Sequence, residues 1–139
     1  MLVSFQNFFC AMVIGSLGLA SFAEGSDSQL CDQSIEIVAQ NSSVPREIIY
    51  KIARLESGRH VNGSHVSWPW SINNEGKGYF LKDSTTALSM LSSLVAQGKT
   101  NIDVGCMQLN IRWHAKFFDS FRHMMNPSDN VRYAARYLE

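Results

Sequence analysis

The sequence predicts a mostly α-helical domain of the α+β class, in which helices are separated by one irregular insert. Three observations favour this class. Apolar residues recur at helical spacing, as at Ile49, Ile52 and Ala53, whereas residues 58–83 collect glycines and aromatic rings. The 139 residues are 45% hydrophobic and 17% charged, which is typical of one globular domain. Twelve basic residues balance twelve acidic ones, which argues against a nucleic-acid-binding protein.

Residues 1–23 predict a secretory signal peptide that is cut before Glu24. The stretch carries no charged side chain, and its apolar centre at residues 8–20 is short for a membrane span. Ser21-Phe22-Ala23 places small residues where a signal peptidase cuts. The missing Lys or Arg near the start leaves an uncleaved membrane anchor as the alternative. We therefore expect a periplasmic protein.

Two helices are expected next. The first runs from residue 27 or 28, where Asp and Ser are good N-caps, to about Asn41. Residues 42–45 interrupt it. Ser43 is then expected to cap a second helix, with Pro45 in its first turn and Gly58 at its end.

The insert is expected to be a loop followed by a short hairpin. Its strands would be Trp70–Ile72 and Tyr79–Leu81, joined by a turn over residues 73–76. After the insert, a helix is expected from Asp83 or Ser84 to about Gln97. A Gly-containing turn over residues 101–110 then leads into a short helix. A helix over residues 113–124 and a last helix opened by Asn126-Pro127 are expected to follow.

Glu56 is the candidate catalytic residue. It stands seven positions after Ile49, at i+7 of the apolar stripe, so we expect it on the core-facing side of the second helix. Desolvation and the negative end of the helix dipole would both raise its pKa, and a protonated glutamic acid can act as a general acid. The alternative is a helix-end ion pair with Arg54, Arg59 or His60. Ser57 would either hydrogen-bond the Glu56 carboxyl or cap the helix.

Two cysteines, Cys31 and Cys106, remain once the signal peptide and Cys10 are removed. An even pair in an oxidising compartment favours a disulfide, which would be worth roughly 2–4 kcal/mol. Two buried free thiols are the alternative. A further alternative is a Cys106 nucleophile activated by His114.

Ile52-Ala53-Arg54-Leu55-Glu56-Ser57-Gly58-Arg59 resembles the catalytic Glu-Ser motif of soluble lytic transglycosylases, in the lysozyme-like superfamily. Gly105-Cys106-Met107-Gln108-Leu109-Asn110 is similar to the Gly-Leu-Met-Gln motif of that family, with Cys in place of Leu. The segments 68–73 and 76–80, and the helix after Asn126-Pro127, also resemble members of the family. The resemblance covers roughly residues 30–139.

The resemblance implies a lysozyme-like fold in which the insert helps to form a substrate cleft. Glu56 would serve as acid and then base in the cleavage of peptidoglycan glycan strands, and the product would be a 1,6-anhydromuramoyl end. Met107 and Gln108 would line the cleft and Ser57 would orient the Glu56 carboxyl. A disulfide would tie the first helix to the active-site turn. The family carries a later Ala-Tyr-Asn motif that is missing before Glu139, so we expect a domain over residues 24–139 that is truncated at its C-terminus.

Other candidates remain open. Asp103 could be a second carboxylate that positions water, or a turn-forming residue that bonds backbone N–H groups. The rings of Trp68, Trp70, Tyr79 and Phe80 could stack on sugars or form a satellite core, and Trp70 and Tyr79 are the better candidates for substrate binding. The four histidines (His60, His65, His114 and His123) lack metal-ligand spacing, so no metal or cofactor is expected.

The sequence thus predicts a monomeric peptidoglycan lytic transglycosylase, with glycan strands as its partner and secretion or cell-wall machinery as possible further partners. A hydrolytic muramidase is the nearest alternative, and a non-catalytic wall-binding or secretion-assembly protein is another. The sequence does not distinguish internal from terminal cleavage of the strand.

Overall fold

The computed structural model describes residues 26–139, so the predicted signal peptide lies outside the described residues. The helical elements are η1 (Asp27–Gln29), α1 (Leu30–Ala39), α2 (Arg46–Ser57), α3 (Ser84–Ala96), α4 (Ile111–His114), η2 (Ala115–Phe117), α5 (Phe121–Met125) and α6 (Pro127–Leu138). The strands are β1 (Gly58–Val61), β2 (Ser64–Ser67), β3 (Ser71–Asn74), β4 (Lys77–Phe80), β5 (Ile102–Val104) and β6 (Leu109–Asn110).

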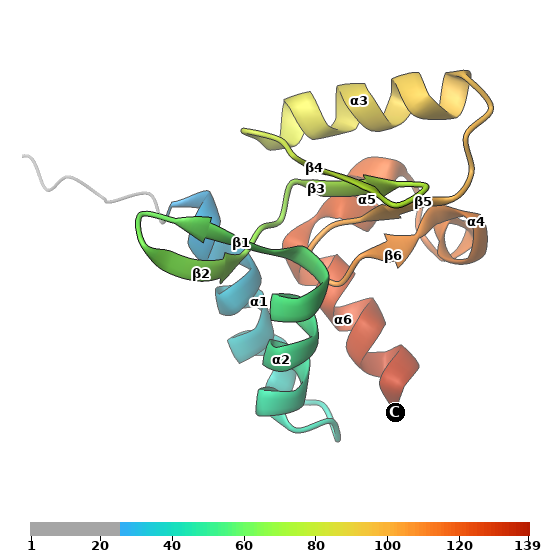
Figure 1. Cartoon of the computed structure of the whole chain (residues 1–139). Coiled ribbons are helices and arrows are strands. Elements are labelled where there is room, and N and C mark those ends of the chain that lie inside the picture. The colour runs from blue at the N-terminus through green and yellow to red at the C-terminus, as the bar shows by residue number, and fades with distance from the viewer. Residues whose placement is uncertain (1–25) are drawn as a thin grey trace, which may run out of the picture.

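The strands form two antiparallel sheets. β1 and β2 make a separate hairpin, and a four-stranded sheet has the order β4-β3-β5-β6. Figure 1 shows α3 across the upper face of this sheet, with α1, α2 and α6 grouped below it. The α+β class is therefore confirmed. The strands are more extensive than the single hairpin expected, and the description of a mostly α-helical domain does not hold.

Local side chains explain where several helices begin. Asp83 caps α3, because its Oδ1 accepts a hydrogen bond from the Thr86 N–H at 2.7 Å. Asn126 caps α6 through hydrogen bonds from the Ser128 and Asp129 N–H groups. The expected cap at Ser43 is wrong, because α2 begins after Pro45 with no side-chain cap.

Three expected elements differ in the structure. The loop after Gly58 is the β1–β2 hairpin, whose Asn62-Gly63 turn has positive φ at both residues, the combination that suits a tight hairpin. The segment 101–110 contains β5 and β6 around a turn. The single helix over 113–124 is broken into α4, η2 and α5, because Phe118 is extended and the Ser120 side chain caps a new helix.

The core lies where α1 and α6 pack against each other and against the sheet. Ile35, Ile49, Leu91, Val104 and Val131 are among its fully buried side chains. Cys31 and Cys106 form a disulfide within it, with 5.7 Å between their Cα atoms. The disulfide links α1 to the turn between β5 and β6. Within residues 26–139, no helix is both long and apolar enough to cross a membrane.

Candidate active site

Glu56 lies in the last turn of α2. Ile49 and Ala53 on the same stripe are buried, but the Glu56 side chain is exposed, so the expectation of a core-facing carboxylate is wrong. The apolar stripe of α2 is buried only as far as Ala53. In the last turn of the helix the buried residue is Ser57, with 1% of its surface exposed. The carboxylate can therefore meet a large ligand directly.

The pKa of Glu56 is nonetheless raised above its ordinary value. The larger cause is desolvation by the surrounding protein, and the second is the negative charge of Asp103. Two of the three basic residues that could have neutralised Glu56 have other contacts. Arg54 forms an ion pair of 2.9 Å with Asp32, and the Arg59 guanidinium lies 4.8 Å from the Trp68 ring centroid. Among residues 26–139, Glu56 forms no ion pair and receives no hydrogen bond, so the helix-end ion pair is not observed.

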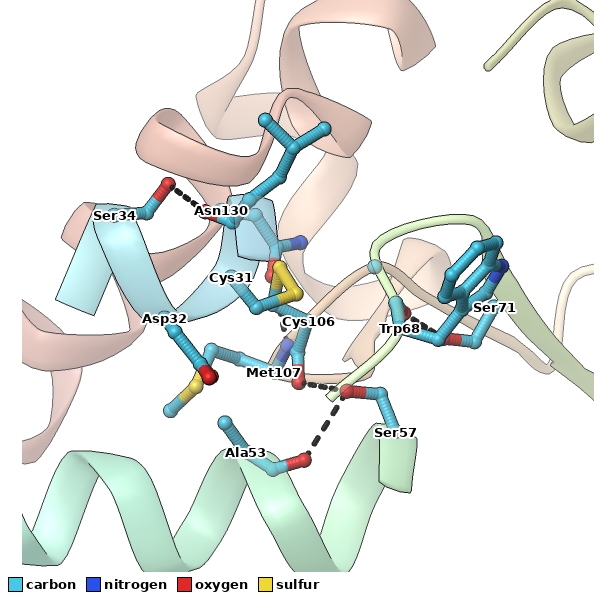
Figure 2. Close-up of a disulfide and its surroundings, with 12 residues drawn as sticks. Cys31, Asp32, Ser34, Ala53, Ser57, Trp68, Ser71, Cys106, Met107 and Asn130 are labelled. Atoms are coloured by element: carbon cyan, nitrogen blue, oxygen red, sulfur yellow. Dashed lines mark hydrogen bonds between the residues drawn. A yellow bond between two sulfur atoms is a disulfide. The ribbon is translucent and has the colours of Figure 1, made fainter. Parts of the chain in front are cut away.

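Ser57 anchors the end of α2 to the segment Gly105–Gln108, which we call the 105–108 turn. Its Oγ lies 2.7 Å from the Cys106 carbonyl oxygen and 3.1 Å from the Ala53 carbonyl oxygen, and its one proton can be donated to either. Figure 2 shows this side chain pointing from the helix toward Cys106. Ser57 does not hydrogen-bond Glu56, so the expected hydrogen bond to the carboxyl is not observed. It holds the helix end that carries Glu56.

The buried side chain of Asn130, on α6, holds the 105–108 turn from the other side. Its Oδ1 accepts a hydrogen bond from the Met107 N–H at 2.9 Å, and its Nδ2 donates to the carbonyls of Val104 and Met124 at 3.1 and 3.0 Å. A Cβ added to Gly105 would lie 2.5 Å from Asn130 Nδ2, and φ there is +81°. Only glycine fits at this position without strain.

Gln108 also adopts positive φ, at +46°, which is unusual for a side-chain-bearing residue. Its amide Nε2 donates to the carbonyls of Gly105 and Ser71 at 3.0 and 3.3 Å, so the side chain ties the turn to β3. It stays half-buried, and of the two turn residues expected to line the cleft it is the one that keeps surface for a ligand.

Two predicted substrate-binding residues belong to the core. Met107 has 6% of its surface exposed and Trp70 has 8%. The Trp70 indole N–H donates to the Asp27 carboxylate at 2.7 Å. Both side chains are packed in the core, and their role in substrate binding stays a prediction. Tyr79 is half-buried on β4, an edge strand of the sheet, with the Lys77 ammonium 5.2 Å from its ring centroid.

Asp103 lies on β5 rather than in a turn. Its Oδ1 accepts a hydrogen bond from Asn110 Nδ2 at 2.9 Å, and the same amide group donates to Asn101 Oδ1 at 2.9 Å. Asp103 is thus a half-buried carboxylate, held in place by a side chain, whose charge acts on Glu56. The turn-forming interpretation is wrong.

Comparisons with protein-family models, curated proteins and solved structures gave no match to this chain. In the part of the chain that the structure describes, no three His, Cys, Asp or Glu side chains lie close enough to hold a metal ion. The site is therefore defined by its own geometry: an exposed carboxylate with a raised pKa, at a helix end fixed to a buried, cross-linked turn.

Proposed function

We propose that this protein is a peptidoglycan lytic transglycosylase with Glu56 as its acid and base. The observation that carries the proposal is the accessible Glu56 carboxylate, whose pKa is raised and which no cation among the described residues neutralises. A general acid must be protonated near its working pH and must reach the oxygen that it protonates. The raised pKa moves Glu56 toward the first condition, and its exposure supports the second.

The proposed reaction needs one carboxyl group. Glu56 gives its proton to the oxygen that links N-acetylmuramic acid to N-acetylglucosamine, and the bond from that oxygen to the anomeric carbon breaks. The muramoyl 6-hydroxyl oxygen then bonds to the anomeric carbon, and its proton passes to Glu56. The products are a 1,6-anhydromuramoyl end and a free N-acetylglucosamine hydroxyl, and Glu56 is protonated again. Most glycosidases consume a water molecule and use two carboxylates, whereas this reaction needs neither water nor a second carboxylate.

The resemblance of residues 52–59 and 105–110 to lytic transglycosylases supports this proposal and, with it, a lysozyme-like fold. The two segments are far apart in the chain, yet the Ser57 Oγ and the Cys106 carbonyl oxygen are only 2.7 Å apart. A periplasmic location, glycan strands as partner and a monomeric state belong to the same proposal.

One observation favours a second candidate, a hydrolytic muramidase. Asp103 lies close enough to Glu56 for its charge to raise the pKa of Glu56. A second carboxylate beside a general acid can activate water, as in inverting glycosidases.

The test is to incubate the purified protein with peptidoglycan sacculi and to identify the released ends by mass spectrometry. Anhydromuramoyl ends support the transglycosylase, and reducing muramic acid ends support the muramidase. Glu56→Gln should abolish release in either case while the circular dichroism spectrum stays unchanged. Asp103→Asn should leave the transglycosylase product intact but would abolish hydrolysis. Release by Glu56→Gln at the parent rate would refute both mechanisms, and binding without release would indicate a wall-binding protein.

A further inference from the structure

Two exposed aromatic rings, each with a cation lying over it, are on the short helical segment that follows β6. Trp113 is 64% exposed and Phe117 is 60% exposed. The Arg112 guanidinium lies 6.0 Å from the Trp113 ring centroid, and the Lys116 ammonium lies 5.1 Å from the Phe117 centroid. We call these four residues the 112–117 strip. The two rings are four residues apart, and so are the two cations, which is close to one helical turn. Each end of the strip therefore presents one ring with one cation.

The strip has a fixed position relative to the candidate active site. Asn110 caps α4, because its Oδ1 accepts a hydrogen bond from the Arg112 N–H at 3.1 Å. The Nδ2 of the same residue donates to Asp103 at 2.9 Å, and Asp103 is the carboxylate whose charge acts on Glu56. One side chain thus joins the start of the strip to the site. A ligand held on the strip would be held in a defined register relative to Glu56.

The inner side of the strip rests on an aromatic cluster. The Phe117 ring centroid lies 5.7 Å from that of Tyr133, and the Tyr133 hydroxyl is 2.9 Å from His114 Nδ1. These contacts anchor Phe117 from within while most of its surface stays in solvent. An exposed ring that is already ordered loses little conformational entropy when a ligand covers it.

The charge of the segment is one-sided. Residues 110–118 contain Arg112 and Lys116 and no Asp or Glu. A flat apolar ring suits the apolar face of a pyranose sugar, and the cation that lies over each ring suits a carboxylate carried by that sugar or the next. The repeat of ring and cation matches a polymer in which sugars carry carboxylates at intervals.

We propose that the 112–117 strip binds an acidic glycan, namely the uncut part of a glycan strand whose sugars bear carboxylate-containing peptides. This inference rests on the proposed function, because it takes the strand as the ligand of the candidate active site. The strip holds the strand through stacking and ion pairing, and Glu56 cuts it.

The test measures binding of the Glu56→Gln protein to sacculi by co-sedimentation, because this variant leaves the strand uncut. Adding Trp113→Ala and Phe117→Ala should weaken binding about tenfold, which corresponds to about 1.4 kcal/mol. Adding Arg112→Gln and Lys116→Gln should remove most of the dependence of binding on salt. Ile37→Ala, which changes an exposed apolar residue on α1, is the matched control and should leave binding unchanged. Thermal unfolding checks that each variant is folded.

Each outcome decides the proposal. Unchanged binding in the folded Trp113→Ala, Phe117→Ala variant would overturn it, and so would equal binding to sacculi and to chitin, a neutral glycan. Failure of the Glu56→Gln protein to bind sacculi would overturn it as well, and a protein partner would then be the better explanation of the exposed rings. Failure of the proposed function is a separate result. In that case the parent protein releases no anhydromuramoyl ends, although binding still depends on Trp113.

Discussion

Replacing Asn130 with alanine removes the side chain that holds the 105–108 turn against α6. Asn130 is fully buried and makes three hydrogen bonds, with the Met107 N–H and with the carbonyls of Val104 and Met124. The Asn130→Ala variant therefore tests whether the buried amide is what stabilises the turn.

The expected loss follows from the groups left without a partner. A buried N–H without an acceptor costs about 1–3 kcal/mol, and each of the two carbonyls adds about 1 kcal/mol. We expect a total of about 3–5 kcal/mol, a large part of the 5–15 kcal/mol that is typical of whole domains. At about 4 °C per kcal/mol for a domain of this size, the Tm would fall by about 12–20 °C.

Urea unfolding followed by circular dichroism measures this loss, with Asn41→Ala, an exposed asparagine without a side-chain hydrogen bond, as the control. The same variant should release glycan more slowly well below its Tm, because the Cys106 carbonyl would no longer be held in place for Ser57. A free energy of unfolding within 1 kcal/mol of the parent would refute the argument.

Three further predictions concern the same region. Ser57→Ala should cost about 1–2 kcal/mol in urea unfolding, because a buried carbonyl loses its donor, whereas Ser64→Ala on the exposed hairpin should cost nothing measurable. Replacing Cys31 and Cys106 with serine should cost about 2–4 kcal/mol, and equal stability of the parent with and without a reductant would contradict a disulfide. The raised pKa of Glu56 predicts that glycan release falls as the pH rises through that pKa, because the proton donor is lost. Asp103→Asn should move this fall to lower pH, and an unmoved profile would exclude the charge of Asp103 as a cause. The contribution of Glu56 to the free energy of unfolding follows the same pH dependence. It is fully present below the ordinary Glu pKa and is lost as the pH rises through the raised pKa of the folded protein. Glu56→Gln should therefore not destabilise the protein at neutral pH.

The sequence predicted the ends of those helices that are capped or stopped by residues at the helix ends themselves. Asp83 and Asn126-Pro127 mark the starts of α3 and α6 as expected, and Gly58 follows the end of α2. The β1–β2 hairpin was missed although Asn62-Gly63 is a strong turn signal. The residues on either side of the turn are mostly polar and do not show the alternation of apolar and polar residues that is typical of a strand. β5 and β6 are too short to show any period. β5 pairs with β3, which lies about thirty residues earlier, and β6 pairs with β5, so their strand geometry comes from this pairing.

The sequence pointed to individual residues of the candidate site but not to the contacts between them. The spacing of Ile49, Ala53 and Glu56 shows which face of α2 turns inward, but not that the core stops before the last turn. Asn130 gave no signal, since an asparagine inside a helix is usually exposed and its three partners lie on other segments. The burial of Trp70 could not be predicted, because an aromatic ring in a glycine-rich segment looks the same in sequence whether it faces a ligand or the core.

Three attachments that reach across the chain hold the 105–108 turn to helices. The disulfide spans 75 residues, the Ser57 hydrogen bond spans 49, and the Asn130 hydrogen bond to Met107 spans 23. Each attachment comes from a different helix, so no fragment that lacks α1, α2 or α6 can hold the turn in its native form. Loop closure over such distances must be complete before the carboxylate of Glu56 and the turn face a ligand together. The chain thus assembles its candidate site only when its first and last described helices have met.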